Sequence, residues 1–274
     1  MEKIQLSVLF KIIGIGSASG LLYHNDLLYI ISDNSTYLYE YNIANEKLNK
    51  IALVEYAQEN IPKKDKPDFE AITLKDDHIN VIGSGSTENR NMIILYNLKL
   101  KKAKVRSMVP VYSLIKSQLS IKDEELNIEG FITNAGATYI FQRGNGMAGK
   151  NGIFYSDNKT KIPKYSYIPF DLPKINNVTA TFTDAILIDD KIYFLATAEN
   201  TTSTYEDGEV MGSIIGTIDL KTMKLINSIQ ISDKHKFEGL TLYKKTATQT
   251  ELLLCEDNDS EELVSTIYLL KFSV

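Results

Sequence analysis

Short apolar runs separated by polar turns fill this chain from end to end, and their arrangement recurs. A typical unit opens with two apolar runs around a tight turn, as in residues 21–23 and 27–31, and a third run leads into a hairpin, as in the segments beginning at Tyr41 and Tyr96. Runs rich in β-branched residues and Tyr, bounded by Asn, Asp, Gly and Lys, are typical of β-strands. The pattern therefore predicts an all-β chain with four strands in each unit.

One short motif marks the start of every unit. Its second position, which we call the axial column, falls at intervals of 51, 59, 54 and 55 residues and reads Ser19, Glu70, Glu129, Thr183, Glu238. The piece left over at the two ends of the chain amounts to 54 residues, so five units close a ring. Repeats of this length with several short strands each are typical of propellers. We predict a five-bladed β-propeller whose column residues open the innermost strands.

The two ends of the chain complete one blade in this scheme. The last unit contains only three predicted strands, whereas the N-terminus begins with the strand-like run Ile4–Ile13, which has no partner in its own unit. We therefore expect this run to supply the fourth strand of the last blade and to close the ring. Residues 1–274 then form a single domain, with one short helix expected over residues 112–120.

The predicted topology places one set of loops on the same face as the axial column. These loops follow the second strand of each unit and begin at Ser32, Gly83, Gln142, Thr197 and Cys255. They are long and polar, whereas the turns at the opposite ends of the strands are short. Long loops gathered on one face of a rigid scaffold are the usual place for binding and catalysis.

Composition and charge narrow the possible partners. The net charge of −5 gives no reason to expect nucleic acid, whose binding proteins carry basic patches. No apolar run approaches the roughly 20 residues needed to span a bilayer. We also expect the protein to be a monomer. The one cysteine, Cys255, excludes an internal disulfide. The first residues read as a strand and not as a signal peptide, which favours the cytoplasm, while a periplasmic or secreted location stays open if a leader was removed.

The axial column carries the main chemical signal. Three glutamates and two hydroxyls directed into one narrow channel would repel one another unless a cation neutralised them. An all-oxygen donor set without Cys or His suits a hard ion, calcium before magnesium. The alternative is that these side chains hydrogen-bond backbone groups that line the channel.

Several segments resemble the calcium-activated apyrases, which are soluble nucleotidases with five blades and one calcium ion on the axis. The resemblance lies in residues 19–43, 69–86, 128–131 and 236–240 and in the segment around Thr183. The family holds its ion with a Ser, Glu, Glu, Ser, Glu series, one residue per blade. This chain matches that series throughout the axial column, with Thr183 in place of the fourth Ser. The resemblance implies a calcium-dependent hydrolase of a phosphate ester or anhydride. Glu-Gly repeats are also similar to those of phytase-like esterases and sugar-lactonase-type propellers.

Four residues in the loops beside the column are candidates for the reaction. Asp33 and Asp257 stand at matching places in the first and last units, where either could orient or deprotonate a water molecule. Arg90 and Arg143 are the arginines of these loops, and a guanidinium suits bidentate contact with a phosphate of a small anionic substrate. The alternative for each is an ordinary solvated charge. At the level of function, the alternative is a non-catalytic propeller whose calcium is structural and whose rim binds a ligand or protein partner.

Two further motifs attract notice. Residues 144–150 fit a G-x-G-x-x-G pattern and are one residue short of a P-loop, but both motifs require a following helix, and the next residues read as a strand. We therefore interpret them as a loop at the rim. His235 precedes Glu238 by three residues on the near face, which makes it a weaker functional candidate.

Overall fold

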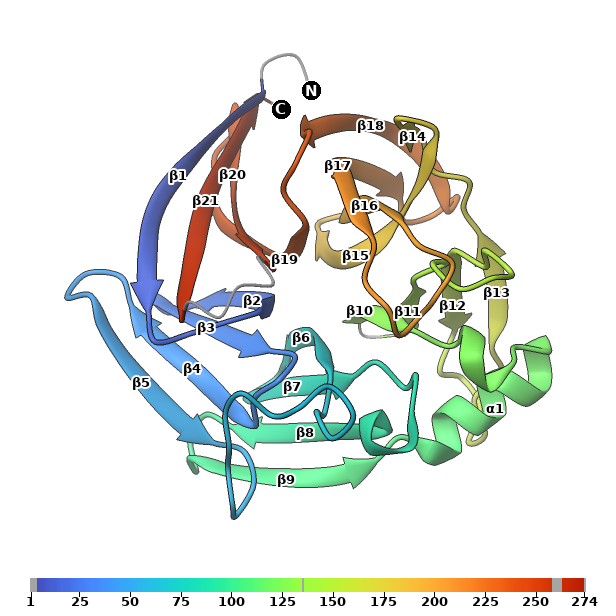
Figure 1. Cartoon of the computed structure of the whole chain (residues 1–274), viewed down its shortest axis with the longest axis horizontal. Helices are drawn as coiled ribbons and strands as arrows, with labels where there is room; N and C mark the ends of the chain where they lie inside the picture. The colour runs from blue at the N-terminus through green and yellow to red at the C-terminus, as the bar shows by residue number, and fades with distance from the viewer. Residues whose placement is uncertain (1–3, 135, 258–262, 274) are drawn as a thin grey trace.

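The computed structural model describes residues 4–134, 136–257 and 263–273, and within them the strands form five antiparallel sheets around a central axis (Figure 1). The predicted five-bladed propeller is confirmed. The near-face loop that follows Cys255 was expected to continue through residues 258–262, which lie outside the described residues.

The four main strands of each blade follow one another outward from the axis in chain order, except that the last blade takes its outermost strand from the start of the chain. From the axis outward, blade 1 contains β2 (Ala18–His24), β3 (Leu27–Ser32), β4 (Tyr37–Asn42) and β5 (Lys47–Ala52), and blade 2 contains β6 (Phe69–Lys75), β7 (His78–Gly83), β8 (Met92–Asn97) and β9 (Lys102–Ser107). Blade 3 contains β10 (Ile128–Thr133), β11 (Thr138–Gln142), β12 (Gly152–Ser156) and β13 (Ser166–Pro169). Blade 4 contains β15 (Val178–Ile188), β16 (Lys191–Asn200), β17 (Glu209–Asp219) and β18 (Lys224–Ser232). Blade 5 contains β19 (Phe237–Lys245), β20 (Gln249–Glu256), β21 (Val264–Ser273) and β1 (Ile4–Ile13).

Four elements lie outside the simple four-strand scheme. The two-residue strand β14 (Lys174–Ile175) pairs with β15 and adds a fifth strand to blade 4. The helix α1 (Val109–Leu119) lies between blades 2 and 3, where the sequence predicted it, and it begins three residues earlier than expected. Two single turns of 3₁₀ helix, Glu88–Arg90 and Asp123–Glu125, lie in the connections that approach the cavity described below.

The core lies between the blades. Side chains alternate between the two faces of each strand, and those on the faces turned toward a neighbouring blade are apolar and buried. One cluster packs Ile30 of blade 1 against Leu253 of blade 5, and another packs Phe141 of blade 3 against Phe182 of blade 4. Because neighbouring blades share these clusters, the rigid ring fixes the positions of the innermost strands.

Strand β1 pairs antiparallel with β21, from Ile4 opposite Phe272 to Ile13 opposite Val264. This is the pairing that the sequence predicted for the N-terminal run. That the pairing holds the ring closed stays a prediction, which the Discussion develops. No helix in the described part of the chain is long and apolar enough to cross a membrane.

A β-bulge occurs at the same place in all five blades. The pairing of the two innermost strands slips by one residue between Ala18 and Gly20 in blade 1, and the skipped residue is Ser19. The corresponding slips in the other blades skip the remaining members of the axial column, Glu70, Glu129, Thr183 and Glu238. A bulge redirects the side chain of the extra residue. The five bulges therefore place the axial column around the head of the channel.

Close packing at the axis explains the small residue that follows most column positions. A Cβ atom on Gly239 would lie 2.5 Å from the Cys255 sulfur and 3.0 Å from the backbone of Gly20 in the next blade. Blade 4 has Asp184 at this place instead, and its carboxylate accepts hydrogen bonds from the backbone amides of Ala185 and Leu240 at 2.7 Å. Burial raises the pKa of Asp184 well above its usual value, while these two hydrogen bonds oppose the rise. Asp184 thus links blades 4 and 5.

Candidate functional site

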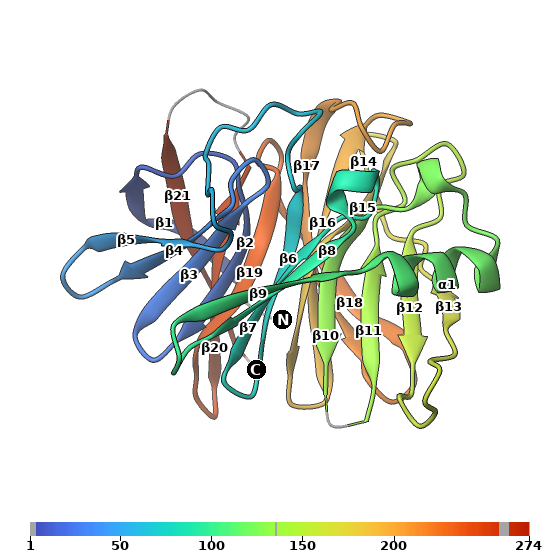
Figure 2. The same ribbon diagram turned by 90° about the horizontal axis from the view of Figure 1, so that it is seen from below.

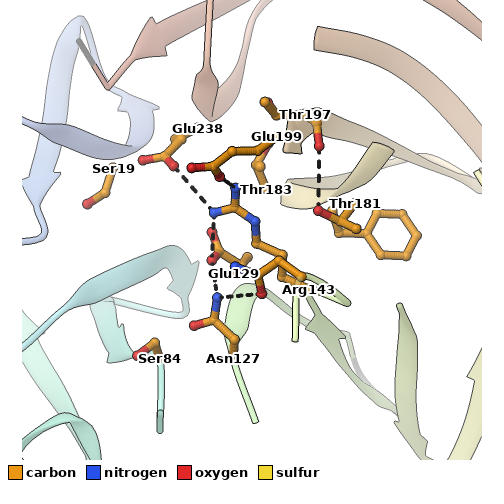
Figure 3. A network of polar contacts seen from close by, with 12 residues as sticks. Ser19, Ser84, Asn127, Glu129, Arg143, Thr181, Thr183, Thr197, Glu199 and Glu238 are labelled. Atoms are coloured by element: carbon orange, nitrogen blue, oxygen red, sulfur yellow. Dashed lines mark hydrogen bonds and ion pairs between the residues drawn. The ribbon is translucent and has the colours of Figure 1, made fainter. Parts of the chain in front are cut away.

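The head of the channel widens into a cavity of about 490 Å³. Among the described residues that line it are nine carboxylates and five basic side chains, so carboxylates are in excess. Figure 3 shows members of the axial column gathered around the guanidinium of Arg143. This cavity brings together most of the site residues predicted from sequence.

The two hydroxyls of the axial column connect neighbouring blades. Ser19 donates a hydrogen bond to the backbone carbonyl of Phe69 at 2.5 Å, and Thr183 donates one to the carbonyl of Phe237 at 2.7 Å. Each acceptor directly precedes the column residue of the next blade. This part of the column therefore has the backbone-bonding role that the sequence left open as an alternative, and an oxygen that donates in this way still carries lone pairs for a cation.

Glu70 differs from the other two column glutamates because no hydrogen bond or ion pair reaches its carboxylate from the described residues. Burial raises the pKa of Glu70 well above its usual value, and the negative charges of Glu129, Asp68, Glu238 and Asp33 raise it further. A buried carboxylate without a partner is costly when ionised. Of the three column glutamates, Glu70 is therefore the one that a bound cation or a proton would stabilise most.

Glu129 and Glu238 share the guanidinium of Arg143. One nitrogen of Arg143 lies 3.3 Å from Glu129 and 3.7 Å from Glu238, and the other is bonded to Glu199 (Figure 3). Glu129 also accepts a hydrogen bond from Asn127 at 2.8 Å. The sequence placed Arg143 among the near-face loops. The structure places it inside the channel head, where it is 4% exposed.

A second basic residue, Lys236, supports the same end of the channel. Its ammonium lies 2.9 Å from Glu238 and 3.2 Å from Asp257. Asp257, one of the two predicted catalytic residues, is therefore at the cavity and is ion-paired. Burial disfavours the charged form of Lys236, but the carboxylates around it outweigh that effect and raise its pKa.

The other predicted catalytic residue, Asp33, belongs to a cluster on the side of blades 1 and 2. Lys66 bonds to Asp33 and lies 2.9 Å from Asp68, and Arg90 lies 2.7 Å from Asp68. Burial raises the pKa of Asp33 to about 6, with Lys66 opposing the rise and the charge of Asp257 adding to it. Arg90 is 3% exposed, so both predicted phosphate-binding arginines lie in the cavity wall and not on an exposed rim.

Three buried polar atoms at this cavity have no hydrogen-bond partner among the described residues. They are one carboxylate oxygen of Asp33, one of Glu129, and the Nε nitrogen of Arg143. Buried polar groups in folded proteins nearly always have a partner, including ordered water and ions. Each of these three atoms is itself buried, so they add unpaired polar groups to the cavity wall without facing its open space.

The oxygen atoms that line the cavity meet some, but not all, of the requirements of the predicted calcium site. The column supplies only oxygen, carboxylates are in excess, and no hydrogen bond or ion pair from the described residues reaches Glu70. Within the described residues, however, the acids whose ligand oxygens all lie within 4.8 Å of one another are Asp33, Asp68 and Glu70, and Lys66 already bonds two of them. The axial glutamates lie farther apart, with Arg143 between two of them. A cation here would share its ligands with Arg143 and Lys236.

Sequence reasoning missed several of these residues, and some of them left a signal. Asp68, Asn127 and Lys236 each stand two positions before a column residue, so the same repeat register contains a second polar column. Lys66 and Glu199 left no such signal, because Lys66 comes from the connection before β6 and Glu199 from the end of β16.

The other motifs have local roles. The residues after the Gly-rich segment 144–150 form strand β12 and not a helix, as expected, and Lys150 donates to the backbone carbonyl of Ser120 at 3.1 Å. His235 bonds to Glu256 and is not among the residues found to line the cavity. Cys255 is a small buried residue.

Solved structures similar to this chain share its fold at low sequence identity. A luciferin-regenerating enzyme is 9% identical with a TM-score of 0.50, covering 98% of this chain and 95% of the other. The glutaminyl cyclase of Myxococcus xanthus is 8% identical with a TM-score of 0.52, covering 98% and 97%. The allergen Mala s 1 of Malassezia sympodialis is 8% identical with a TM-score of 0.56, covering 97% and 96%. At such identities the likeness concerns the fold alone.

Comparison of the sequence itself gives one match. The sequence profile of a family described as a family of unknown function (DUF6929) matches residues 14–272. No curated protein matches the chain.

Proposed function

The chain belongs to DUF6929, a family of unknown function, and we propose from its cavity that it is a calcium-dependent hydrolase of small phosphate esters or anhydrides. The observation that carries this proposal is that the bulged column residues Glu70, Glu129 and Glu238 line a cavity where carboxylates outnumber basic groups. A surplus of buried negative charge needs a cation or protons, and oxygen donors favour calcium.

The calcium ligands in this proposal are the axial column residues Ser19, Glu70, Glu129, Thr183 and Glu238. A bound calcium ion would act as a Lewis acid toward a phosphoryl oxygen. Glu70 is the most available of these donors, because Glu129 is already paired with Arg143 and Glu238 with Lys236.

The protein's own groups have the following roles in this proposal. Asp33, with a pKa of about 6, is the better of the two candidates for orienting or deprotonating water, since a general base works best near the operating pH. Asp257 is tied to Lys236 and acts mainly by holding that lysine. Arg143 and Arg90 line the cavity, and their positive charges would attract a phosphate.

One observation favours a second candidate. Arg143 and Lys236 already neutralise part of the column charge, and the two column hydroxyls bond to backbone. These contacts favour a non-catalytic propeller whose axial network is structural and whose cavity binds an anionic ligand. An esterase or lactonase of the phytase-like or sugar-lactonase type would use the same scaffold with another substrate.

A substrate panel separates these functions. We expect release of inorganic phosphate from at least one nucleotide, sugar phosphate or inositol phosphate in calcium, and its loss in chelator. The Asp33→Asn variant should lose at least about a hundredfold in rate, the low end of what general-base catalysis contributes, while still binding calcium. Phosphate release that persists in chelator would contradict the calcium requirement. Binding of the same compounds without turnover would support the binding module.

A further inference from the structure

The connection between β16 and β17 crosses the mouth of the cavity. We call residues 201–208 of this connection the strap. On one side, Thr204 donates to the backbone of Glu124 at 3.0 Å, and Asn145 donates to the backbone of Ser203 at 3.2 Å. On the other side, the strap reaches the connection between β5 and β6. Figure 2 shows both connections on the same face of the ring.

The contact on that second side is an ion pair with an aromatic ring beside it. Lys63 lies 2.5 Å from the carboxylate of Asp207, and the Tyr205 ring lies 5.3 Å from the Lys63 ammonium and 5.5 Å from the Arg90 guanidinium. The side chains of Lys63 and Asp207 are 40% and 55% exposed. Such solvated pairs contribute little to stability, so they exchange partners readily.

The carboxylate of Asp207 faces several positive charges. Asp207 lines the cavity together with Lys63, Lys66 and Lys236. Burial opposes the ionisation of Asp207, but the hydrogen bond from Lys63 and the charges of Lys236 and Lys66 lower its pKa. Lys66 and Lys236 have other carboxylate partners deeper in the cavity, whereas Asp207 is the partner that Lys63 has at the mouth.

We propose that the mouth of the cavity is an anion site centred on Lys63, that Asp207 is its internal occupant, and that the phosphate group of a ligand displaces Asp207 and lifts the strap. The proposal rests on the proposed function only in expecting a phosphate-bearing ligand. Tyr205 moves with the strap, because it lies two residues from Asp207 and packs on the same lysine. Ligand entry and strap opening are thus one event.

The chain contains no tryptophan, so Tyr205→Trp introduces a single fluorescent reporter on the strap. Tryptophan keeps the aromatic contact with Lys63. Inorganic phosphate is titrated in chelator at low ionic strength, and we expect a saturable change in fluorescence. Adding Asp207→Asn should tighten phosphate binding about two- to fivefold, because removing an exposed competing pair is worth about that much. Adding Lys63→Gln should weaken it by a similar factor or more.

Two controls match these variants. Asp189→Asn removes a different exposed aspartate, one paired with Lys245 at the far turn between β15 and β16, and should leave phosphate binding unchanged. Tyr56→Trp places the reporter at a side chain that is 80% exposed and is not among those found to line the cavity, and should give no response. Calorimetry of phosphate binding to the parent and to Asp207→Asn checks the result without the reporter.

Unchanged or weaker phosphate binding in Asp207→Asn would overturn the proposal. So would an equal gain in Asp189→Asn, which would assign the effect to net charge, or the absence of any saturable response in Tyr205→Trp. None of these readouts requires calcium or turnover. The anion site can therefore fail while hydrolysis holds, and it can hold in a protein that hydrolyses nothing.

Discussion

At the scale of single residues, the three axial glutamates are not equivalent. Glu129 and Glu238 lie within ion-pair distance of Arg143, and Glu238 also pairs with Lys236, whereas Glu70 has no such partner among the described residues. Removing a charge from a paired glutamate leaves a buried cation unsatisfied. Removing it from Glu70 relieves repulsion instead. The same chemical change thus has opposite consequences at two neighbouring positions of one ring.

Glu70→Gln keeps the side-chain volume and should weaken calcium binding, yet the variant should be no less stable than the parent in chelator. The matched change Glu238→Gln should lower the free energy of unfolding in chelator by at least about 1 kcal/mol, because Lys236 and Arg143 each lose a charged partner. Thermal unfolding of both variants with calcium and with chelator measures these effects. Equal destabilisation of the two variants in chelator would contradict the assigned pairing.

The hydroxyl of Ser19 allows a second test at this scale. Ser19→Ala should lower the free energy of unfolding by about 1–3 kcal/mol in chelator as well as in calcium, because the buried carbonyl of Phe69 loses its donor from the next blade. Ser7→Ala, at an exposed position of β1, is the control and should be neutral within about 0.5 kcal/mol. A loss that appears only in calcium would instead show that Ser19 acts solely as a ligand.

At the scale of elements, the repeated bulge converts five ordinary inner strands into one site. The sequence contained this information, because the column position is followed by a small residue in four of the five units. The positions of the strands and of α1 could also be predicted from apolar runs and turn residues. The extra strand β14 could not, because two residues at the edge of a sheet carry no periodicity.

Deleting residues 1–13 tests the closure of the ring by β1. The deletion exposes the edge of β21 and removes the buried side chain of Ile12 and the partly buried Ile4 and Leu6 from the core. Burying such side chains is worth about 1.5–3 kcal/mol each when complete, and each kcal/mol corresponds to about 2–4 °C in a domain of this size. We expect the melting temperature to fall by about 10 °C or more. A fall of a degree or two, no larger than after deletion of residues 1–3 alone, would show that β1 is dispensable.

At the scale of the whole molecule, the ring and its axial column could be predicted from sequence, but the charge balance of the channel could not. The repeat register determines which residues reach the axis. Which acid pairs with which base depends on side-chain directions across blades, as for Lys66 with Asp33 and Arg143 with Glu199. Because of such pairings, the two predicted arginines lie in the cavity wall and not at the rim. The pairings also reduced the negative charge left for a metal ion.

Calcium binding to the parent protein tests the central claim most directly. Protein stripped with chelator is titrated with calcium by calorimetry, and its thermal unfolding is followed in calcium, magnesium and chelator. We predict one calcium site per chain, weaker magnesium binding, and a gain in the free energy of unfolding of about 2.7 kcal/mol when calcium is at a hundred times its dissociation constant. Absence of binding heat, with a melting temperature that is the same in calcium, magnesium and chelator, would contradict the calcium site and the hydrolase function proposed from it.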